Sequence, residues 1–323
     1  MTDKTGCLST KGTKGVSRIF SCLPVFQLSG MTEELRGEFV RQLLNCLLNR
    51  SIDGVYLKKK DFLNEHALLS WVKLYDIVIV DTGIDLPLQE IRMESYDKSV
   101  PAGFIWTDGN DLALEGFAGQ LIKELDERVS RIPIWACILI GGKSSRMGQP
   151  KHLIEDEHNL TWLERTTNIL RPLVEGVVVS GSGLLPDKLA DIERLVDIPN
   201  VVGPLTGILA AMRWQPLVTW MFVACDMPHI TPEAIHWLLS KRRSGCWGRV
   251  PRLAGNKHCE PLLAWYDFRA AQLFEEQNYS GNLRIGAVAS HLKIDNPVIP
   301  EALAYGWQNI NTPEQLKAAL EFK

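Results

Sequence analysis

The sequence has no long apolar run and no strong excess of charge of either sign. None of its apolar stretches reaches the roughly 18 residues that a membrane-spanning helix needs. The polar residues 1–15 lack the apolar segment of a secretory signal. The net charge is −3, whereas a surface for nucleic acid or an anionic membrane shows a clear positive excess. We therefore expect neither of these partners, and we expect residues 1–17 to form a short disordered leader.

The sequence also lacks paired cysteines. Seven cysteines are present, none of them in a Cys-x-x-Cys pair, and their number is odd. This pattern argues against a zinc ribbon and against a disulfide framework. It predicts a protein of the reducing cytoplasm.

A chain of 323 residues is longer than one typical domain, so we expect two domains. The dipeptide Ile132-Pro133 marks the boundary that we expect, with a smaller domain at residues 18–131. Within it, apolar residues at helical spacing predict helices over residues 33–49 and 112–129. A continuous β-branched run flanked by acids at residues 76–81 predicts a buried parallel strand. Strands alternating with helices indicate an α/β fold.

The larger domain, residues 132–323, shows the same alternation over a longer stretch. The predicted strands are residues 134–140, 176–180, 218–225 and 262–266. The predicted helices are residues 161–170, 186–195, 207–214, 231–242 and 312–321. This order predicts a doubly wound, mostly parallel sheet, and such sheets bind their ligands at the carboxyl ends of the strands.

A glycine pair follows the first strand of the larger domain. Gly141 and Gly142 carry no Cβ, so their backbone N–H groups can approach an anion closely. Arg146 and Lys151 follow and are spaced to reach phosphate groups. The loop is not a Walker A motif, because the pattern GxxxxGK[ST] is absent. A glycine pair after a strand is also a common simple turn, so this loop alone leaves both interpretations open.

Asp226 favours the phosphate-binding interpretation. It follows the apolar strand at residues 218–225, which places a carboxylate at the ligand-binding edge of the sheet. Mg²⁺ in nucleotide sites is typically held by one or two carboxylates together with substrate phosphates. The alternative is that Asp226 caps the next helix, but Thr231, followed by Pro232, already provides a helix start. We therefore predict that Asp226 binds Mg²⁺.

Four segments of the larger domain resemble the motifs of the MobA-like nucleotidyltransferases, and they occur in the same order. The segments are LIGGKSSRMGQPK at residues 139–151, GPLTG at 203–207, CDMP at 225–228 and NINTPE at 309–314. The resemblance implies a Rossmann-like nucleotidyltransferase domain. It also implies an enzyme that uses Mg²⁺ to transfer GMP from GTP to the terminal phosphate of Mo-molybdopterin, with release of pyrophosphate.

The resemblance implies a role for each residue that matches a motif. The implied nucleotide-binding residues are Leu139, Ile140, Gly141, Gly142, Lys151, Ser180, Asp197 and Asp226. The residues implied for the second substrate are Arg146, Gly203, Pro204, Asn309 and Asn311. The implied catalytic residues are Arg146, Lys151 and Asp226, and Asp226 is also the implied metal ligand. Ser180 stands where the family commonly has Asn, and Ile140 stands where it usually has Ala.

Alternative functions remain at this point. The two glycines favour GTP, whereas relatives that transfer CMP tend to carry Ala-Gly, so a cytidylyltransferase is one alternative. Another MobA-like transferase acting on a sugar phosphate is a second alternative. The third is a non-catalytic adaptor of cofactor biosynthesis, against which the joint presence of Lys151, Arg146 and Asp226 argues.

The smaller domain weakly resembles the GTP-binding MobB-type adaptor, through residues 25–30 and 76–81. It lacks the P-loop Lys and Ser/Thr, and Glu33 and Glu34 stand where phosphates would bind. A degenerate P-loop adaptor and a generic α/β packing domain are both consistent with these residues. Other proteins of molybdenum cofactor biosynthesis, or apo-molybdoenzymes, are the partners that we would expect for such an adaptor.

Overall fold

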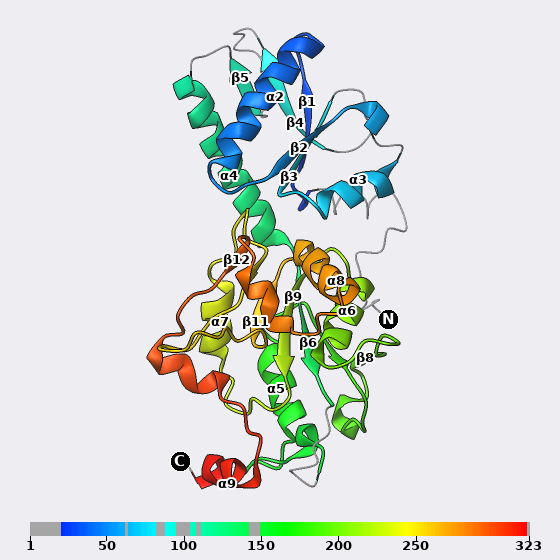
Figure 1. Ribbon diagram of the computed structural model, residues 1–323, viewed down its shortest axis with the longest axis vertical. Coiled ribbons are helices and arrows are strands. Elements are labelled where there is room, and N and C mark those ends of the chain that lie inside the picture. The colour runs from blue at the N-terminus through cyan, green and yellow to red at the C-terminus, as the bar shows by residue number, and fades with distance from the viewer. Residues whose placement is uncertain are drawn as a thin grey trace. The chain divides into compact units, whose positions relative to one another are not determined.

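The computed structural model describes residues 21–61, 64–81, 88–94, 104–107, 111–141 and 149–321 (Figure 1). The chain forms two compact units. The N-terminal unit comprises Met1–Ile132 together with Arg242–Gly245, and the C-terminal unit comprises Pro133–Lys241 together with Cys246–Lys323. None of the helices in the described ranges is long and apolar enough to span a lipid bilayer.

The N-terminal unit contains a five-stranded sheet in the order β2-β3-β1-β4-β5, with every neighbouring pair parallel. Its strands are β1 (Val25–Ser29), β2 (Gly54–Leu57), β3 (Ile77–Asp81), β4 (Gln89–Glu94) and β5 (Phe104–Thr107). Its helices are α2 (Glu33–Leu48), α3 (Glu65–Val72) and α4 (Asp111–Arg131). Side chains of α2 and α4 share one apolar core with the sheet, and the rings of Phe39 and Phe117 meet edge to face at 5.6 Å. Helix α3 lies on the other face of the sheet (Figure 1).

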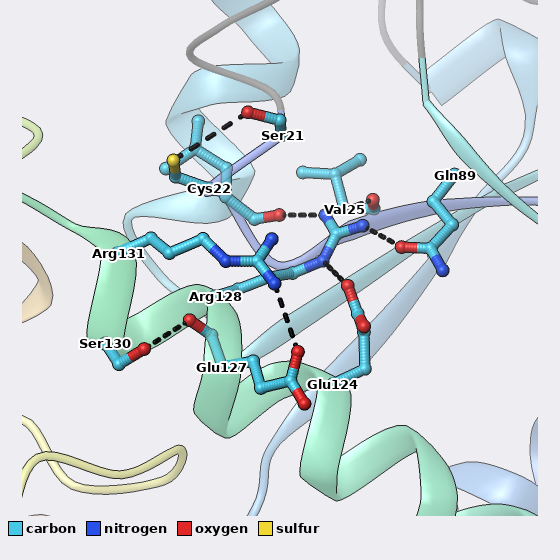
Figure 2. A network of polar contacts seen from close by, with 10 residues as sticks. Ser21, Cys22, Val25, Gln89, Glu124, Glu127, Arg128, Ser130 and Arg131 are labelled. Carbon is cyan, nitrogen blue, oxygen red and sulfur yellow. Dashed lines mark hydrogen bonds and ion pairs between the residues drawn. The ribbon is translucent and has the colours of Figure 1, made fainter.

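Arg128 ties helix α4 to the start of β1 (Figure 2). Its Nη1 donates to the carbonyl oxygen of Leu23 at 2.6 Å, and its Nη2 donates to the side chain of Gln89. Its Nε donates to Glu124 at 2.9 Å, and the guanidinium lies 4.3 Å from the centre of the Phe26 ring. Burial lowers the pKa of Arg128, while Glu124 favours its charged form. The partners satisfy most donors of this buried cation, so its role is structural.

The C-terminal unit contains a seven-stranded sheet in the order β12-β10-β11-β9-β6-β7-β8. The strands are β6 (Ile134–Leu139), β7 (Gly176–Ser180), β8 (Glu193–Leu195), β9 (Thr219–Ala224), β10 (Gly248–Arg249), β11 (Ala264–Tyr266) and β12 (Ile294–Asp295). Strands β8, β7, β6 and β9 are parallel, and β11 is antiparallel to both of its neighbours. The sheet is therefore mixed but mostly parallel, as the sequence predicts.

Helices cover both faces of this sheet (Figure 1). They are α5 (Trp162–Leu170), α6 (Pro204–Trp214), α7 (Pro232–Leu239), α8 (Ala271–Tyr279) and α9 (Pro313–Glu321). Helices α5 and α7 contribute to one core with β6 and β9, in which the indole of Trp265 donates to the carbonyl oxygen of Leu238 at 2.8 Å. On the other face, Trp214 of α6 packs on Trp135 of β6, with ring centres 5.2 Å apart. The doubly wound arrangement is thereby confirmed.

Short 3-10 helices fill several connections. They are η1 (Lys59–Asp61), η2 (Lys151–Leu153), η3 (Asp187–Leu189), η4 (Phe268–Ala270), η5 (Ile285–Ser290) and η6 (Glu301–Trp307).

The helix predicted at residues 186–195 is wrong. The segment forms η3 and then the edge strand β8, which pairs with β7. Leu189, Ile192 and Leu195 are the buried residues of this segment. Their spacing of three imitates the apolar face of a helix, but here a tight turn and a strand bury the same residues.

Candidate active site

Strands β6, β7 and β9 of the C-terminal unit end side by side, and their carboxyl ends form the base of the site. Leu139, the last residue of β6, is in register with Ser180 of β7 and with Ala224 of β9. The backbone N–H of Ile140 donates to the carbonyl oxygen of Ser180 at 2.8 Å. The residues after these strands therefore emerge together at the carboxyl edge of the sheet, where α/β proteins bind ligands.

Glycines after β6 and β7 let the segments that follow these two strands pass close to each other. Gly141 has φ = +116° and Gly181 has φ = +120°, which L-residues with a side chain rarely adopt. A Cβ on Gly181 would lie 1.8 Å from the carbonyl oxygen of Ile140. Only glycine fits at position 181, and Gly141 and Gly181 both line the pocket.

Lys151, Asp226 and Asn311 meet beside these loops, although they are far apart in the sequence. The Nζ of Lys151 lies 2.9 Å from Oδ2 of Asp226 and donates to Oδ1 of Asn311 at 2.7 Å. The side chains of Lys151 and Asp226 are 16% and 21% exposed. The backbone N–H of Ile310 donates to the carbonyl oxygen of Asp226 at 3.0 Å, which holds the segment around Asn309 and Asn311 against the end of β9. A cation, a carboxylate and an amide thus face solvent from a fixed backbone.

The neighbouring thiol is not a nucleophile. Cys225 is buried, and burial together with the charge of Asp226 raises the pKa of its thiol to about 12. The thiol is therefore protonated at neutral pH, and nucleophilic chemistry needs the thiolate.

The N-terminus of α6 forms the opposite wall. Gly203 precedes the helix with φ = +73°, and Pro204 is its first residue. Thr206 Oγ1 accepts from the backbone N–H of Ile198 at 2.6 Å, which fixes the segment that carries Asp197. A Cβ on Gly207 would lie 2.9 Å from the Oγ of Ser180, so glycine allows α6 to approach β7. The positive end of the helix dipole thereby faces the pocket.

These elements enclose a pocket of about 640 Å³. The predicted site residues that line it are Leu139, Ile140, Gly141, Lys151, Ser180, Asp197, Gly203, Pro204, Asp226, Asn309 and Asn311. Gly142 and Arg146 lie outside the described residues. The hydroxyl of Ser180 is buried and has no hydrogen-bond partner among the described residues, whereas Asp197 is exposed.

Comparisons with known proteins agree with this geometry. A family model described as the MobA-like NTP transferase domain matches residues 136–290. A probable molybdenum cofactor guanylyltransferase of Pelotomaculum thermopropionicum is 32% identical over 191 residues, which are 56% of this chain and 89% of that protein. The chain belongs to the MobA-like NTP transferase family.

Two further proteins are similar to part of this chain. A molybdenum cofactor biosynthesis bifunctional protein of Synechocystis is 30% identical over 189 residues, 58% of this chain and 53% of that protein. The matched region thus spans about half of that relative's length. The crystal structure of molybdopterin-guanine dinucleotide biosynthesis protein A from Archaeoglobus fulgidus is 27% identical. It covers 58% of this chain and 97% of its own, with a TM-score of 0.47.

MobA-like NTP transferases typically use a divalent metal, and the donor chemistry of this pocket fits one. Asp226 supplies a hard carboxylate oxygen at the pocket, which suits Mg²⁺ when substrate phosphates supply the other oxygens. Within the described residues, Oδ1 of Asp226 has no hydrogen-bond partner. The same residues contain no group of three or more His, Cys, Asp and Glu that could hold a metal without a substrate. The residues therefore fit a metal that binds together with the nucleotide.

Sequence reasoning missed residues that shape this MobA-like pocket. Gly181, Ser182, Thr206 and Gly207 line it, and Arg194 of β8 holds its edge. The Arg194 guanidinium donates to the carbonyl oxygen of Gly181 at 2.6 Å and to that of Gly183 at 2.8 Å. The glycines directly after the predicted strand at residues 176–180 were a signal for this loop. Nothing local in the sequence indicates the clamp by Arg194, because it lies in the segment predicted as a helix.

The corresponding edge of the N-terminal sheet holds an internal ion pair. Arg36 Nε donates to Asp81 Oδ1 at 2.7 Å, and its Nη1 donates to the carbonyl oxygens of Gly30 at 3.0 Å and Met31 at 2.8 Å. Glu33 at the start of α2 pairs with Lys58. The family match does not include this unit, and its role stays a prediction.

Proposed function

We propose that the chain transfers GMP from GTP to the terminal phosphate of Mo-molybdopterin and releases pyrophosphate. One observation carries this proposal. Lys151, Asp226 and Asn311 converge at the pocket that is also lined by Gly141 and by the N-terminus of α6. A relative named as a probable molybdenum cofactor guanylyltransferase supports this choice of substrates. In this proposal the metal is Mg²⁺, and the protein acts in the cytoplasm.

The nucleotide lies between the glycine loop and α6 in this proposal. The backbone N–H groups around Gly141 and the N-terminus of α6 are donors for phosphate oxygens. Leu139, Ile140, Ser180 and Asp197 also line the pocket, and in this proposal they contact the base and the ribose. The two glycines favour guanine over cytosine.

The acceptor needs no strong general base. Its phosphate has a second pKa of about 6, so it is a dianion at neutral pH. An acceptor oxygen forms a bond to the α-phosphorus while the bond from that phosphorus to the bridging oxygen of pyrophosphate breaks. The ammonium of Lys151, which Asn311 orients, offsets the negative charge on the phosphoryl oxygens. Arg146 acts on the acceptor phosphate.

Asp226 and the substrate phosphates would hold Mg²⁺, which neutralises negative charge on the phosphates when it is bound. Asp226 also positions Lys151 through the 2.9 Å contact. The carboxylate therefore serves both cations of the site.

The test is a turnover assay with the full chain, Mg²⁺ and Mo-molybdopterin, in which each of the four NTPs is supplied in turn and pyrophosphate is measured. We expect release with GTP. Release with CTP but not with GTP would overturn the choice of base in favour of a cytidylyltransferase. No release with any NTP, from protein that unfolds cooperatively, would favour the non-catalytic adaptor.

A further inference from the structure

A second cleft in the C-terminal unit adjoins the active site. Its volume is about 520 Å³, within the range of roughly 300–1,000 Å³ that small-molecule sites occupy. It is lined by one side of α5, by Pro228 and His229 after β9, and by Ile310 and Leu316. The mechanism above uses none of these side chains.

A wall one residue thick separates the two cavities. Asn309 and Asn311 line the active-site pocket, whereas Ile310 between them lines the second cleft. This is the alternation expected of extended chain. Asp226 likewise lines the first cavity, and His229 lines the second. The hydrogen bond from Ile310 N–H to the Asp226 carbonyl joins the two segments of the wall. A ligand in the second cleft therefore lies next to the reacting groups.

The floor of the second cleft is apolar. Trp162 and Ile310 are both 2% exposed, and Leu316 packs on them. The largely buried Trp162 lines the cleft at the start of α5, which the capping box of Thr161 and Glu164 fixes. Such a floor suits the face of a planar ring.

Hydrogen-bonding groups without partners stand around this floor. Among the described residues, the guanidinium of Arg165 makes no hydrogen bond or ion pair. The Nε2 of His229 is buried and has no partner there either, while its ring stacks on Tyr305 with centres 4.0 Å apart. Burial, and then the charge of Arg165, lower the pKa of His229, so the ring is neutral and Nε2 can donate or accept. An unpartnered buried nitrogen is costly unless a ligand satisfies it.

Acidic groups complete the rim. Asp156 and Glu157 line the cleft. Asp156 Oδ1 accepts from the backbone N–H of His158 at 2.8 Å and of Leu160 at 3.1 Å, which fixes this carboxylate at the rim. The cleft is thus lined by hydrogen-bond donors and acceptors as well as by apolar side chains.

We propose that this cleft binds the fused-ring body of the acceptor substrate, a planar heterocycle of the pterin type. The proposal rests on the proposed function, because it takes the acceptor to be a pterin phosphate. A group transfer needs both substrates to reach one phosphate. The two cavities lie on either side of the wall that carries Asp226 and Asn311, so an acceptor held in the second cleft extends its phosphate past the edge of this wall into the active-site pocket. The pterin ring has a carbonyl oxygen for Arg165, a ring nitrogen for His229, and amino N–H groups for the rim carboxylates.

Two variants test this assignment in the full chain. Arg165→Ala removes the free cation, and His229→Phe removes the ring nitrogens while an aromatic ring remains to stack on Tyr305. The control is Arg171→Ala, because Arg171 follows the same helix, is exposed, and pairs with Asp191 away from the cleft. We expect Arg165→Ala to raise the KM for Mo-molybdopterin by roughly tenfold or more, as for one lost hydrogen bond to a charged group. We expect His229→Phe to raise this KM by roughly two- to tenfold, as for one lost hydrogen bond between neutral groups. The KM for GTP and the melting temperature should stay close to those of the control.

A binding assay separates this proposal from the proposed function. The probe is 6-hydroxymethylpterin, titrated into the full chain and followed by its own fluorescence. We expect binding to the wild-type chain and to Arg171→Ala, and weaker binding to both cleft variants. If GMP is transferred but both cleft variants keep the wild-type KM for the acceptor, the assignment is wrong and the function stands. If no NTP is turned over, the function fails, and the pterin titration decides the assignment by itself. The assignment of the cleft is also wrong if Arg165→Ala loses affinity for GTP. It is equally wrong if the wild type, the control and both cleft variants bind the pterin probe with the same affinity.

Discussion

Replacing Asp226 by Asn separates the chemical role of this carboxylate from its structural role. Asn keeps the shape of the side chain and an oxygen that can accept from Lys151 Nζ, but it removes the negative charge. The contact is partly exposed, with 16% of the Lys151 side chain and 21% of the Asp226 side chain accessible. Ion pairs of this kind contribute about 1 kcal/mol or less. We therefore expect Asp226→Asn to lower the melting temperature by about 4 °C at most.

The expected effect on catalysis is much larger. The variant loses the charged oxygen ligand for the metal and the negative charge that strengthens the contact with Lys151. Removing a single preorganised electrostatic group from an active site typically costs about 10²–10³ in kcat. We expect a loss of this size in the pyrophosphate assay with GTP, and no rescue by saturating Mo-molybdopterin.

The matched control is Asp191→Asn, because Asp191 also forms an ion pair at 2.9 Å, with Arg171, but its side chain is 70% exposed. The control should keep wild-type kcat and stability. The reasoning would be refuted if Asp226→Asn retained more than about one tenth of wild-type kcat. It would also be refuted if the activity fell only in proportion to unfolded protein, which circular dichroism at the assay temperature measures.

Three further outcomes follow from the pocket. Gly181→Ala places a Cβ 1.8 Å from the Ile140 carbonyl oxygen and should destabilise the fold by about 1–3 kcal/mol or more. The control Gly255→Ala, at a positive φ with no neighbour within 4 Å, should lower the free energy of unfolding less. Equal decreases in melting temperature for the two variants would contradict the clash at Gly181. Arg194→Ala releases the carbonyls of Gly181 and Gly183 and should raise the KM for GTP severalfold with little change in kcat; an unchanged KM in steady-state kinetics would exclude the clamp. Burial and Asp226 raise the pKa of Cys225 from 9.0 to about 12, so folding favours the protonated thiol. The free energy of unfolding should then fall as the pH rises from 9 towards 12, and less steeply in Cys225→Ala; identical slopes in urea titrations would contradict this.

Much of the fold could be predicted because the spacing of apolar residues and the residues that start helices or turns indicate the same elements in this chain. The run at residues 77–80 is apolar throughout and is flanked by Asp76 and Asp81, and β3 is buried from Ile77 to Val80. Thr231 followed by Pro232 marks the start of α7, and Thr231 indeed accepts from the backbone N–H of Ala234. These signals are local, so a single sequence carries them.

Elements stabilised by distant partners were not predictable in the same way. β10 and β12 are two residues long each, too short for any periodic pattern, and they exist because each pairs with a neighbouring strand. β8 was mistaken for part of a helix, since its buried residues share the spacing of a helical face. The antiparallel direction of β11 likewise depends on its pairing with β9 and β10.

The site shows the same division. Asp226 was predictable from its place after a buried strand, and the glycine loop from its sequence. The contact of Lys151 with Asn311 joins residues 160 positions apart, and only the resemblance to a family brought them together beforehand. Arg165 and His229 gave no local signal, because their significance lies in the cleft that they share.

The most direct measurement follows the α-phosphate of the nucleotide. GTP labelled with radioactive phosphorus at the α-position, and separately at the γ-position, is incubated with the full chain, Mg²⁺ and Mo-molybdopterin, and the products are separated by chromatography. The account predicts that the α-label moves into a dinucleotide of the acceptor and that the γ-label appears only in pyrophosphate. Label in the acceptor from γ-labelled GTP, or α-label that ends in free GMP whether or not the acceptor is present, would contradict nucleotidyl transfer by this pocket.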